Sequence, residues 1–380
     1  MRVAVVHNLT NGGAHRRLAE QVAALEAEVV EFTTSRAVPV TARPYVVPLK
    51  LVAPTLPPVL RPLQRHRDLR TLQDVWRVLG ALAERDGADV IFANPDSVLR
   101  GAVPLGKRAA PVIRYCDEPR RIDYEPALRS SLNPRTRALY AGLRKSERQI
   151  DRTAMAEADA IATNSQYSAA RILDSYGRTA EVLPCGAPAR MTADGSEPAH
   201  LLSVGSLIPS KGHDLAIEAA ALSGLRLPVV VVAHRDNRPE RDRLRALAGK
   251  HDVQLDVRTA ITDEELIGLY RAAFATLYLA TAEPLGLVSI EAQACGSPVI
   301  VSDEGGLPET VAAGRTGLVV SRDARAAARA LHSLTEDGVR ARMSRAAASL
   351  LNGHSWPASA AGLAAMAERL GRRTAVEAVA

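Results

Sequence analysis

The sequence predicts an α/β protein with two Rossmann-like domains, each built on a doubly wound parallel sheet. The chain has 380 residues, more than one ordinary hydrophobic core accommodates. Short apolar runs, typical of buried parallel strands, alternate with helical stretches along its length. A polar segment at 191–200 separates two such series and contains Gly and Pro. The chain is therefore expected to fold as two α/β units joined near this segment.

The first series begins with a strand, a glycine loop and a helix. The apolar run from Val3 to Val6 suits a buried parallel strand, and Gly12 and Gly13 follow it. Apolar residues then recur at helical spacing, an order typical of the unit that opens a Rossmann-like domain. Further strands are expected at 29–32, 89–93, 112–115, 160–162 and 180–183.

The second series starts directly after the polar segment and has the same alternation of apolar runs and helices. Its strands are expected at 201–204, 228–233, 253–257, 275–279, 298–301 and 317–320. Near the end of the chain, Trp356 and Pro357 are followed by an amphipathic stretch that predicts a helix to about residue 370.

Composition restricts the partners and the compartment. The net charge of +6 suits an anionic nucleotide, an acidic membrane surface or nucleic acid. Aromatic residues make up only 3% of the chain and no nucleic-acid motif accompanies the charge, so nucleic acid is not expected. Three cysteines far apart in sequence indicate reduced thiols in a cytoplasmic protein. The absence of an apolar run of about eighteen residues predicts that nothing spans a membrane.

Two basic stretches raise the question of contact with a membrane surface. One includes Arg65, Arg67 and Arg70, and the other lies between residues 135 and 152. A face that meets anionic lipid at the inner side of a membrane, or a charged acceptor, is one interpretation. Solvated helix faces in an arginine-rich protein are the preferred interpretation.

The most informative element places two carboxylates, Glu283 and Glu291, eight positions apart around a Gly-Leu-Val turn. If a helix opens there, the N–H groups of Gly286, Leu287 and Val288 point at whatever occupies the preceding loop. A ligand with phosphate in its middle and hydroxyls at both ends suits this spacing, and a nucleoside diphosphate sugar is such a ligand. A surface loop followed by a charged helix is the alternative.

Residues 261–320 resemble the carboxy-terminal domain of the family 4 retaining glycosyltransferases (glycosyltransferase group 1 type), which have the GT-B fold. The matching elements are Thr262–Tyr270, the Glu283–Glu291 element, Glu291–Val299, Gly305–Glu309 and Thr316–Val320. Weaker similarity extends to Asn11–Ala14, Gly205–Gly212 and Ser355–Trp356. The resemblance implies two Rossmann-like domains that face each other across a cleft.

The same resemblance suggests what each domain does. It implies an acceptor-binding domain at 1–190, completed by the C-terminal helix at about 357–380. A nucleotide-sugar-binding domain would follow at 200–355, and the last helix would cross back to the first domain.

Family members also suggest roles for individual residues of the second domain. Their first glutamate lies beside the transferred sugar and the second holds the ribose hydroxyls, which would make Glu283 catalytic and Glu291 donor-binding. Lys211 would supply the cation for the diphosphate, together with the amides of 286–288; a surface lysine after a strand is the alternative. The donor is a co-substrate, and neither a metal nor another cofactor is expected.

Four residues of the first domain are candidates for the site. Gly13 would let the backbone approach the donor, and Gly12 the acceptor. Asn164 belongs to a short match with an element that lines the family's cleft. His15 would assist the acceptor, although a histidine on a helix surface is equally consistent with its position.

Two positions depart from the family pattern. Asp117 stands where many members have a histidine that touches the sugar, and it can accept hydrogen bonds from sugar hydroxyls but cannot be a cationic donor. Ser206 stands where many members have an arginine that pairs with the lysine on the diphosphate. Arg235 is the candidate to replace that arginine.

The expected function is metal-independent transfer of a hexose-type sugar, with retention of configuration, from a nucleoside diphosphate sugar to an acceptor hydroxyl. The donor base (UDP, GDP or another) and the acceptor (a small molecule, a glycan or a lipid-linked sugar) stay open. Two alternatives remain: a non-hydrolysing sugar-nucleotide epimerase of the GT-B fold, and a catalytically impaired nucleotide-sugar-binding protein. An epimerase would release a changed sugar nucleotide without any acceptor.

Overall fold

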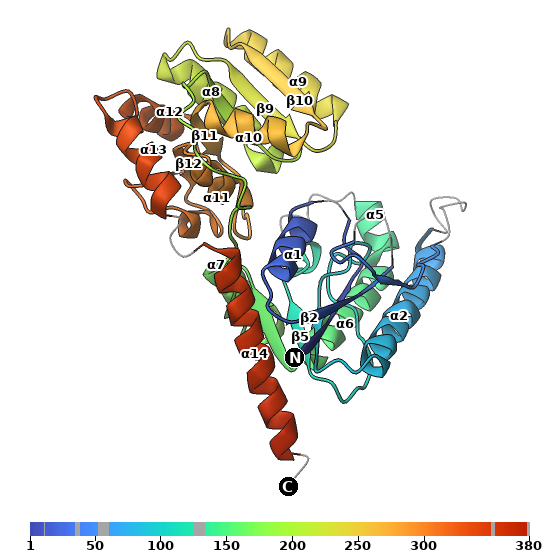
Figure 1. Ribbon diagram of the computed structural model, residues 1–380. Coiled ribbons are helices and arrows are strands. Elements are labelled where there is room, and N and C mark those ends of the chain that lie inside the picture. Colours follow the sequence, from blue (N-terminus) through green and yellow to red (C-terminus); the bar gives the residue numbers. More distant parts are fainter. Residues whose placement is uncertain (11, 35–38, 52–60, 125–133, 351–353, 378–380) are drawn as a thin grey trace. The chain divides into compact units, whose positions relative to one another are not determined.

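The computed structural model describes the chain except residues 11, 35–38, 52–60, 125–133, 351–353 and 378–380 (Figure 1). The chain divides into two compact units. The first contains residues 1–164, 168–183 and 359–380, and the second contains residues 165–167 and 184–358. The boundary after Leu183 precedes the polar segment at 191–200, and the last helix contributes most of its length to the first unit.

The first unit is built on a seven-stranded sheet in the order β3-β2-β1-β4-β5-β6-β7, and all its strand pairs are parallel. The strands are β1 (Arg2–His7), β2 (Glu28–Thr33), β3 (Tyr45–Val46), β4 (Val90–Ala93), β5 (Val112–Tyr115), β6 (Ala160–Thr163) and β7 (Glu181–Val182). The described helices are α1 (Gly13–Ala23), α2 (Arg61–Arg85), α3 (Arg121–Tyr124), α5 (Pro134–Leu139), α6 (Ala141–Glu157), α7 (Gln166–Tyr176) and α14 (Trp356–Glu377).

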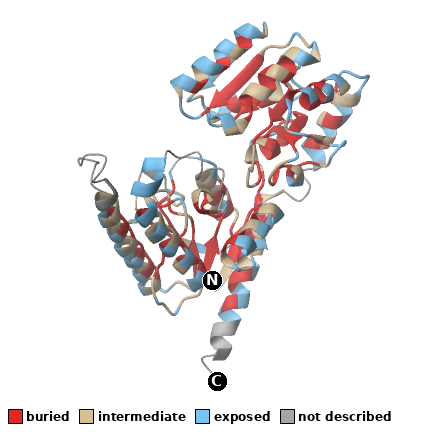
Figure 2. Ribbon diagram, turned by 180° about the vertical axis from the view of Figure 1, so that it is seen from behind, coloured by how far each residue is buried: buried red, intermediate tan, exposed pale blue. Residues whose placement is uncertain are grey.

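Helices cover both faces of this sheet, as the alternation of side chains along β1 requires. Val3 and Val5 pack on one side with Leu18 of α1 and Met366 of α14. Ala4 and Val6 pack on the other side, against helices α2 and α6. Strands whose two faces are both buried, which are red in Figure 2, are largely apolar, and they were therefore recognisable as short runs.

The second unit contains a six-stranded parallel sheet in the order β10-β9-β8-β11-β12-β13. Its strands are β8 (His200–Val204), β9 (Val229–Ala233), β10 (Leu255–Thr259), β11 (Ala273–Tyr278), β12 (Val299–Ser302) and β13 (Gly317–Val320). Its helices are η2 (Pro209–Lys211), α8 (His213–Ser223), α9 (Arg238–Lys250), α10 (Asp263–Arg271), α11 (Leu287–Ala294), η3 (Leu307–Thr310), α12 (Ala324–Ser333) and α13 (Val339–Leu350).

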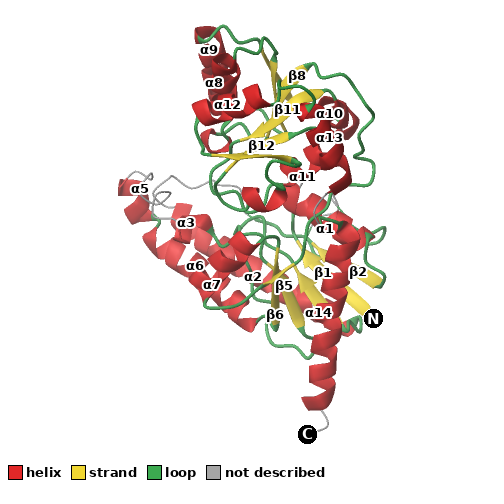
Figure 3. Cartoon of the chain, turned by 90° about the vertical axis from the view of Figure 1, so that its left-hand side faces the viewer, coloured by secondary structure: helices red, strands yellow, loops and turns green. Residues whose placement is uncertain are grey.

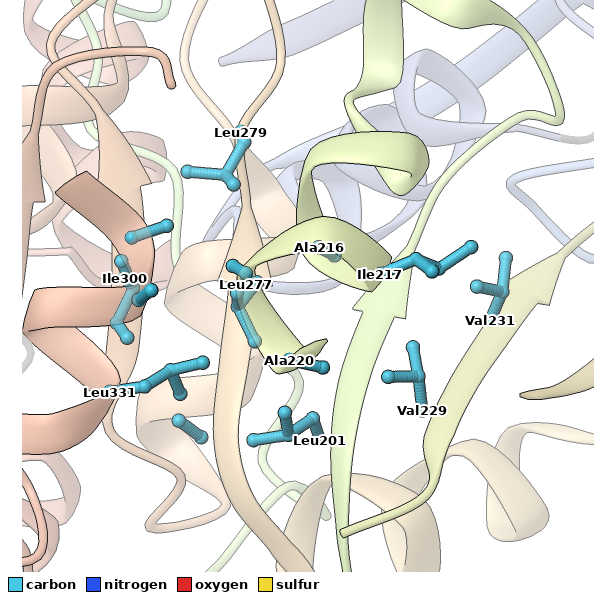
Figure 4. Packing of buried hydrophobic residues seen from close by; sticks show 14 of the residues in the cluster. Leu201, Ala216, Ile217, Ala220, Val229, Val231, Leu277, Leu279, Ile300 and Leu331 are labelled. Atoms are coloured by element: carbon cyan, nitrogen blue, oxygen red, sulfur yellow. The ribbon is translucent and has the colours of Figure 1, made fainter. Parts of the chain in front are cut away.

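The core of the second unit also has two layers, one on each face of the sheet (Figure 3). On one face, Ala216, Ile217 and Ala220 of α8 pack against strand residues that include Leu201 and Leu277 (Figure 4). Helices α10 and α11 cover the opposite face. Tyr278, the last residue of β11, points to that second face, because its neighbour Leu277 points to the first.

The strands expected from the sequence are present, with ends shifted by one or two residues. Strand β3 was not expected, because two residues that include an exposed Tyr45 carry no apolar run. The doubly wound α/β class is confirmed in both units. None of the three cysteines forms a disulfide, and no helix in the described part of the chain is long and apolar enough to cross a membrane.

Two glycines that flank α8 provide a matched test of backbone packing in the second unit. Gly212 (φ 71°) and Gly224 (φ 73°) are both left-handed. A Cβ on Gly212 would lie 2.2 Å from the Leu279 carbonyl oxygen, whereas one on Gly224 would meet nothing within 4 Å. We expect Gly224→Ala to lower the free energy of unfolding by about 1–2 kcal/mol, because alanine is strained in the left-handed backbone conformation. Gly212→Ala should cost about 1–3 kcal/mol more, because it also overpacks the site loop.

The measurement is the unfolding midpoint of each variant in urea, followed by a signal from the second unit. Equal losses for Gly212→Ala and Gly224→Ala would contradict the close approach of Gly212 to β11.

Candidate functional site

The loops that follow β8 and β11 form the candidate site of the second unit. These two strands are neighbours in the sheet, and the chain leaves them toward opposite edges. In a doubly wound sheet such a point opens a crevice at the carboxyl ends of the strands. Gly205–Lys211 follows β8 and Leu279–Gly286 follows β11. Parallel pairing therefore brings together residues that are about seventy positions apart.

Lys211 and Glu283 form an ion pair across these loops. The Lys211 Nζ lies 2.6 Å from the Glu283 Oε2, and the two side chains are only 20% and 19% exposed. The same Nζ lies 3.3 Å from the hydroxyl of Tyr278. The structure thus brings the predicted diphosphate cation and the predicted catalytic carboxylate into contact.

Backbone contacts hold the Glu283 loop in place. The Thr281 N–H donates to the Ser210 carbonyl at 2.9 Å, and the Gly306 N–H donates to the Glu283 carbonyl at 2.8 Å. A Cβ on Gly305 would lie 2.3 Å from that same Glu283 carbonyl oxygen. The Ser165 hydroxyl donates to the Pro284 carbonyl at 2.5 Å. The glycine pair at 305–306 therefore serves as a close-fitting support beneath the loop.

Helix α11 begins at Leu287, with Gly286 as its N-cap at φ 108°. The N–H of Ser289 is bonded to the Gly286 carbonyl at 3.0 Å, whereas the N–H groups of Leu287 and Val288 precede the helix's own acceptors. The predicted amide cluster thus lies at the start of an eight-residue helix, where the dipole favours an anion.

A buried side-chain network fixes the orientation of α11. Gln293 donates to the Thr310 carbonyl at 2.8 Å, and the Thr310 hydroxyl donates to the Ser289 hydroxyl at 2.8 Å. Ser289, Gln293 and Thr310 are all at least 97% buried. The network joins the first turn of α11 to η3, which follows the supporting glycines.

Glu291 lies one turn inside α11 and is only 3% exposed. The hydroxyl of Tyr270, on α10, donates to its Oε2 at 3.1 Å. The predicted ribose ligand is therefore a largely buried carboxylate, held by a tyrosine that the sequence analysis did not single out.

Ser206 and Arg235 lie on neighbouring loops. Asn237 donates to the Leu207 carbonyl at 2.8 Å and so joins the loop after β9 to the loop after β8. Ser206 and Arg235 are both exposed. The structure brings their loops together but gives Arg235 no contact with Lys211 or Glu283, and its role stays a prediction.

The candidates in the first unit follow three strands of its sheet. Gly12 and Gly13 begin α1 after β1, and His15 lies in its first turn with its ring 6.3 Å from that of His7. Asp117 follows β5, and Asn164 follows β6. Asn164 is 92% buried and its side-chain oxygen has no hydrogen-bond partner among the described residues.

Arg17 gives Asp117 a charged partner that the sequence analysis missed. Its Nε lies 3.2 Å from the Asp117 Oδ1, although Arg17 itself is only 1% exposed. The guanidinium also donates to Asn94 at 3.0 Å and lies 3.6 Å from the centre of the Tyr115 ring. No signal in the sequence distinguishes Arg17 from the many other arginines of the chain.

No group of three or more His, Cys, Asp or Glu side chains that could hold a metal ion occurs in the described residues.

Comparison with known proteins identifies the second unit. The sequence profile of the family described as "Glycosyl transferases group 1" matches residues 192–350. The second unit is similar to members of this family. A relative, the D-inositol 3-phosphate glycosyltransferase of Acidothermus cellulolyticus, is 33% identical over 220 residues, or 51% of this chain and 49% of that protein. The chain thus spans about half the length of the curated relatives it matches.

Solved structures extend the likeness to the fold of the whole chain. Sucrose-phosphate synthase from Thermosynechococcus elongatus matches 97% of this chain and 98% of its own, with a TM-score of 0.74 and 22% identity. Anabaena HepE, in complex with UDP-glucose, matches 97% of this chain and 100% of its own, with a TM-score of 0.70 and 15% identity. The GT-B fold is confirmed.

A buried histidine supports the loop after β8 and predicts a pH dependence of stability. Ser203 lies 2.9 Å from Nδ1 of His213, and Nε2 lies 3.2 Å from the Ser206 carbonyl, which suits a neutral ring that donates from Nε2. Burial lowers the pKa of His213 to about 4. The unfolded chain binds this proton first as the pH falls, so stability present above about pH 6.5 should be lost toward pH 4.

Between those pH values, His213 alone is expected to lower the free energy of unfolding by about 3 kcal/mol, since each pKa unit corresponds to about 1.4 kcal/mol. His213→Gln, which cannot titrate, should flatten the curve by that amount. Urea unfolding of both proteins from pH 7 to pH 4 measures the difference. Parallel curves would show that His213 is not held neutral.

Proposed function

We propose that the protein transfers a hexose-type sugar from a nucleoside diphosphate sugar to an acceptor hydroxyl, with retention of configuration and without a metal ion. The observation that carries the proposal is the Lys211–Glu283 pair at the strand crossover, next to the start of α11. A cation and a carboxylate are in contact there, and the set of amides begins three residues after the carboxylate. Departure of a diphosphate from a sugar requires these groups.

The leaving diphosphate would bind Lys211 and the N–H groups of Gly286, Leu287 and Val288. Negative charge accumulates on the diphosphate as the glycosidic bond breaks, so fixed donors stabilise the transition state more than the bound donor. Because these donors are already in place, the proposed mechanism needs no metal to neutralise the charge. Arg235 could add a second cation only by reorienting its exposed side chain.

Glu283 would face the sugar and stabilise the positive charge that develops at its reacting carbon. Glu291 would accept hydrogen bonds from the ribose hydroxyls, with its carboxylate held in place by the Tyr270 hydroxyl. No covalent nucleophile is assigned. The proposed course is front-face attack, in which the leaving phosphate takes the proton of the acceptor hydroxyl.

The first unit would supply the acceptor side. Asp117 can accept from sugar or acceptor hydroxyls, and Arg17 fixes the direction of its carboxylate. Asn164 adds a buried side-chain oxygen that can accept a further hydrogen bond. Gly12, Gly13 and His15 belong to the helix start that also contains Arg17.

UDP-sugars are the first donors to test, because structures of HepE hold UDP or UDP-glucose. Thermal unfolding of the protein should be followed with UDP-, GDP-, ADP- and TDP-glucose, since a ligand that binds the folded state raises the midpoint by mass action. We expect one base to raise the midpoint, and the Lys211→Ala variant to lose most of that rise. A protein that responds to none of these donors at millimolar concentration would contradict the proposal.

Glu283→Gln tests the chemistry itself. The change keeps the size of the side chain and removes its charge, so turnover should fall with little change in nucleotide affinity. We expect a barrier higher by roughly 2–4 kcal/mol, the size of one preorganised electrostatic contact. Steady-state rates with the identified donor, and calorimetric titration with its nucleoside diphosphate, separate the two effects.

Glu264→Gln is the matched control, because Glu264 is an exposed carboxylate in the first turn of α10. Normal turnover by Glu283→Gln together with loss of activity in Asp117→Asn would place the catalytic carboxylate in the first unit instead.

A further inference from the structure

Tyr278 lies beneath the proposed donor site, next to the contact between Lys211 and Glu283. It ends β11 and is only 2% exposed. Its ring lies under the N-cap of α11, since a Cβ on Gly286 would be 3.3 Å from the ring's Cε1. Its hydroxyl is 3.3 Å from the Lys211 Nζ, which itself lies 2.6 Å from the Glu283 Oε2.

The hydroxyl can serve both partners at once. A phenol has one proton to donate and lone pairs to accept with. The Lys211 ammonium donates to the phenol oxygen, which leaves the phenol proton for an acceptor. Burial, together with the negative charge of Glu283 and a hydrogen bond to it, raises the pKa of Tyr278 well above its usual range. The hydroxyl therefore stays protonated and remains a donor to Glu283.

A donor diphosphate would compete with Glu283 for Lys211. An ammonium is a point charge with three donors, and two of them are already directed at Glu283 and Tyr278. As Lys211 turns toward phosphate, the Glu283 carboxylate loses its nearest cation. Among the described residues, the Glu283 side chain accepts a hydrogen bond from Lys211, and the Tyr278 hydroxyl lies next to the same ammonium group. Tyr278 is then the donor left to hold it.

We infer that Tyr278 is a positioning residue for the proposed sugar transfer, whose hydroxyl keeps the Glu283 carboxylate oriented while Lys211 binds the diphosphate. The inference rests on the proposed function, because it assigns Lys211 and Glu283 to the two ends of one donor. It also explains why the last residue of β11 carries a hydroxyl, although the Tyr278 side chain otherwise packs among apolar residues such as Leu202, Val301 and Leu307.

Tyr270 offers a matched comparison on the neighbouring helix. It is a buried tyrosine whose hydroxyl donates to the second glutamate, Glu291, at 3.1 Å. Removal of one hydroxyl from each tyrosine should therefore affect different steps. Tyr278→Phe would disturb the carboxylate near the reacting carbon, and Tyr270→Phe the carboxylate assigned to the ribose.

The experiment measures each variant with UDP as the binding probe and UDP-glucose as the donor; water takes the sugar in place of an acceptor, and release of UDP is followed over time. For Tyr278→Phe we expect turnover at saturating donor to fall about ten- to a hundredfold, as for loss of one hydrogen bond to a charged group. UDP affinity should stay within about threefold, because the diphosphate contacts remain. Tyr270→Phe should have the opposite effect: UDP binding becomes weaker, and turnover falls less than in Tyr278→Phe.

A double variant shows whether Tyr278 acts through Glu283. In the Glu283→Gln background, adding Tyr278→Phe should lower turnover by less than about threefold, because the effects of coupled groups do not multiply. A full ten- to hundredfold further loss would overturn the inference. Turnover of Tyr278→Phe within about twofold of wild type would also overturn it. The same holds if turnover falls only as far as a lowered unfolding midpoint explains. Wild-type protein that neither binds UDP nor consumes UDP-glucose, when no other donor raises its midpoint, would overturn the proposed function and this inference with it.

Discussion

The parallel pairing of β8 with β11 is the constraint on which the candidate site of the second unit depends. Strands that run side by side in the same direction end at the same edge of the sheet, so the loops after them must be neighbours. Lys211 and Glu283 meet for this reason and not because of any local motif. The close approach of Gly212 to Leu279, and the bond from Thr281 to Ser210, show how tightly these loops pack.

Each of two acidic side chains in this unit has a buried tyrosine hydroxyl in its network. The Tyr270 hydroxyl donates to Glu291, and the Tyr278 hydroxyl lies 3.3 Å from the Lys211 Nζ that contacts Glu283. A buried carboxylate is costly unless its lone pairs are satisfied, and a neutral hydroxyl satisfies one without cancelling the charge. A hydroxyl therefore supports such a carboxylate without neutralising it, as a permanent pairing with arginine would.

The first unit uses the opposite arrangement around Asp117. There a buried arginine, Arg17, lies between the carboxylate, the Asn94 side chain and the ring of Tyr115. An aspartate at this position cannot supply positive charge, but the arginine behind it does, so a carboxylate and a guanidinium stand together there. Gln21 extends the network from Arg17 to Ser359 in α14, which ties the last helix to the first unit.

The sequence alone determined the alternation of strands and helices, because strands buried on both faces are largely apolar runs. It also indicated where α11 begins, since a helix N-terminus after a glycine has a local pattern, and its resemblance to a known family pointed to Lys211, Glu283 and Glu291. Tertiary structure alone decided which side chains those residues meet. Tyr278, Tyr270 and Arg17 carry no local signal, because a tyrosine at a strand end or an arginine on a helix is ordinary until the sheet brings its partner from a distant part of the chain.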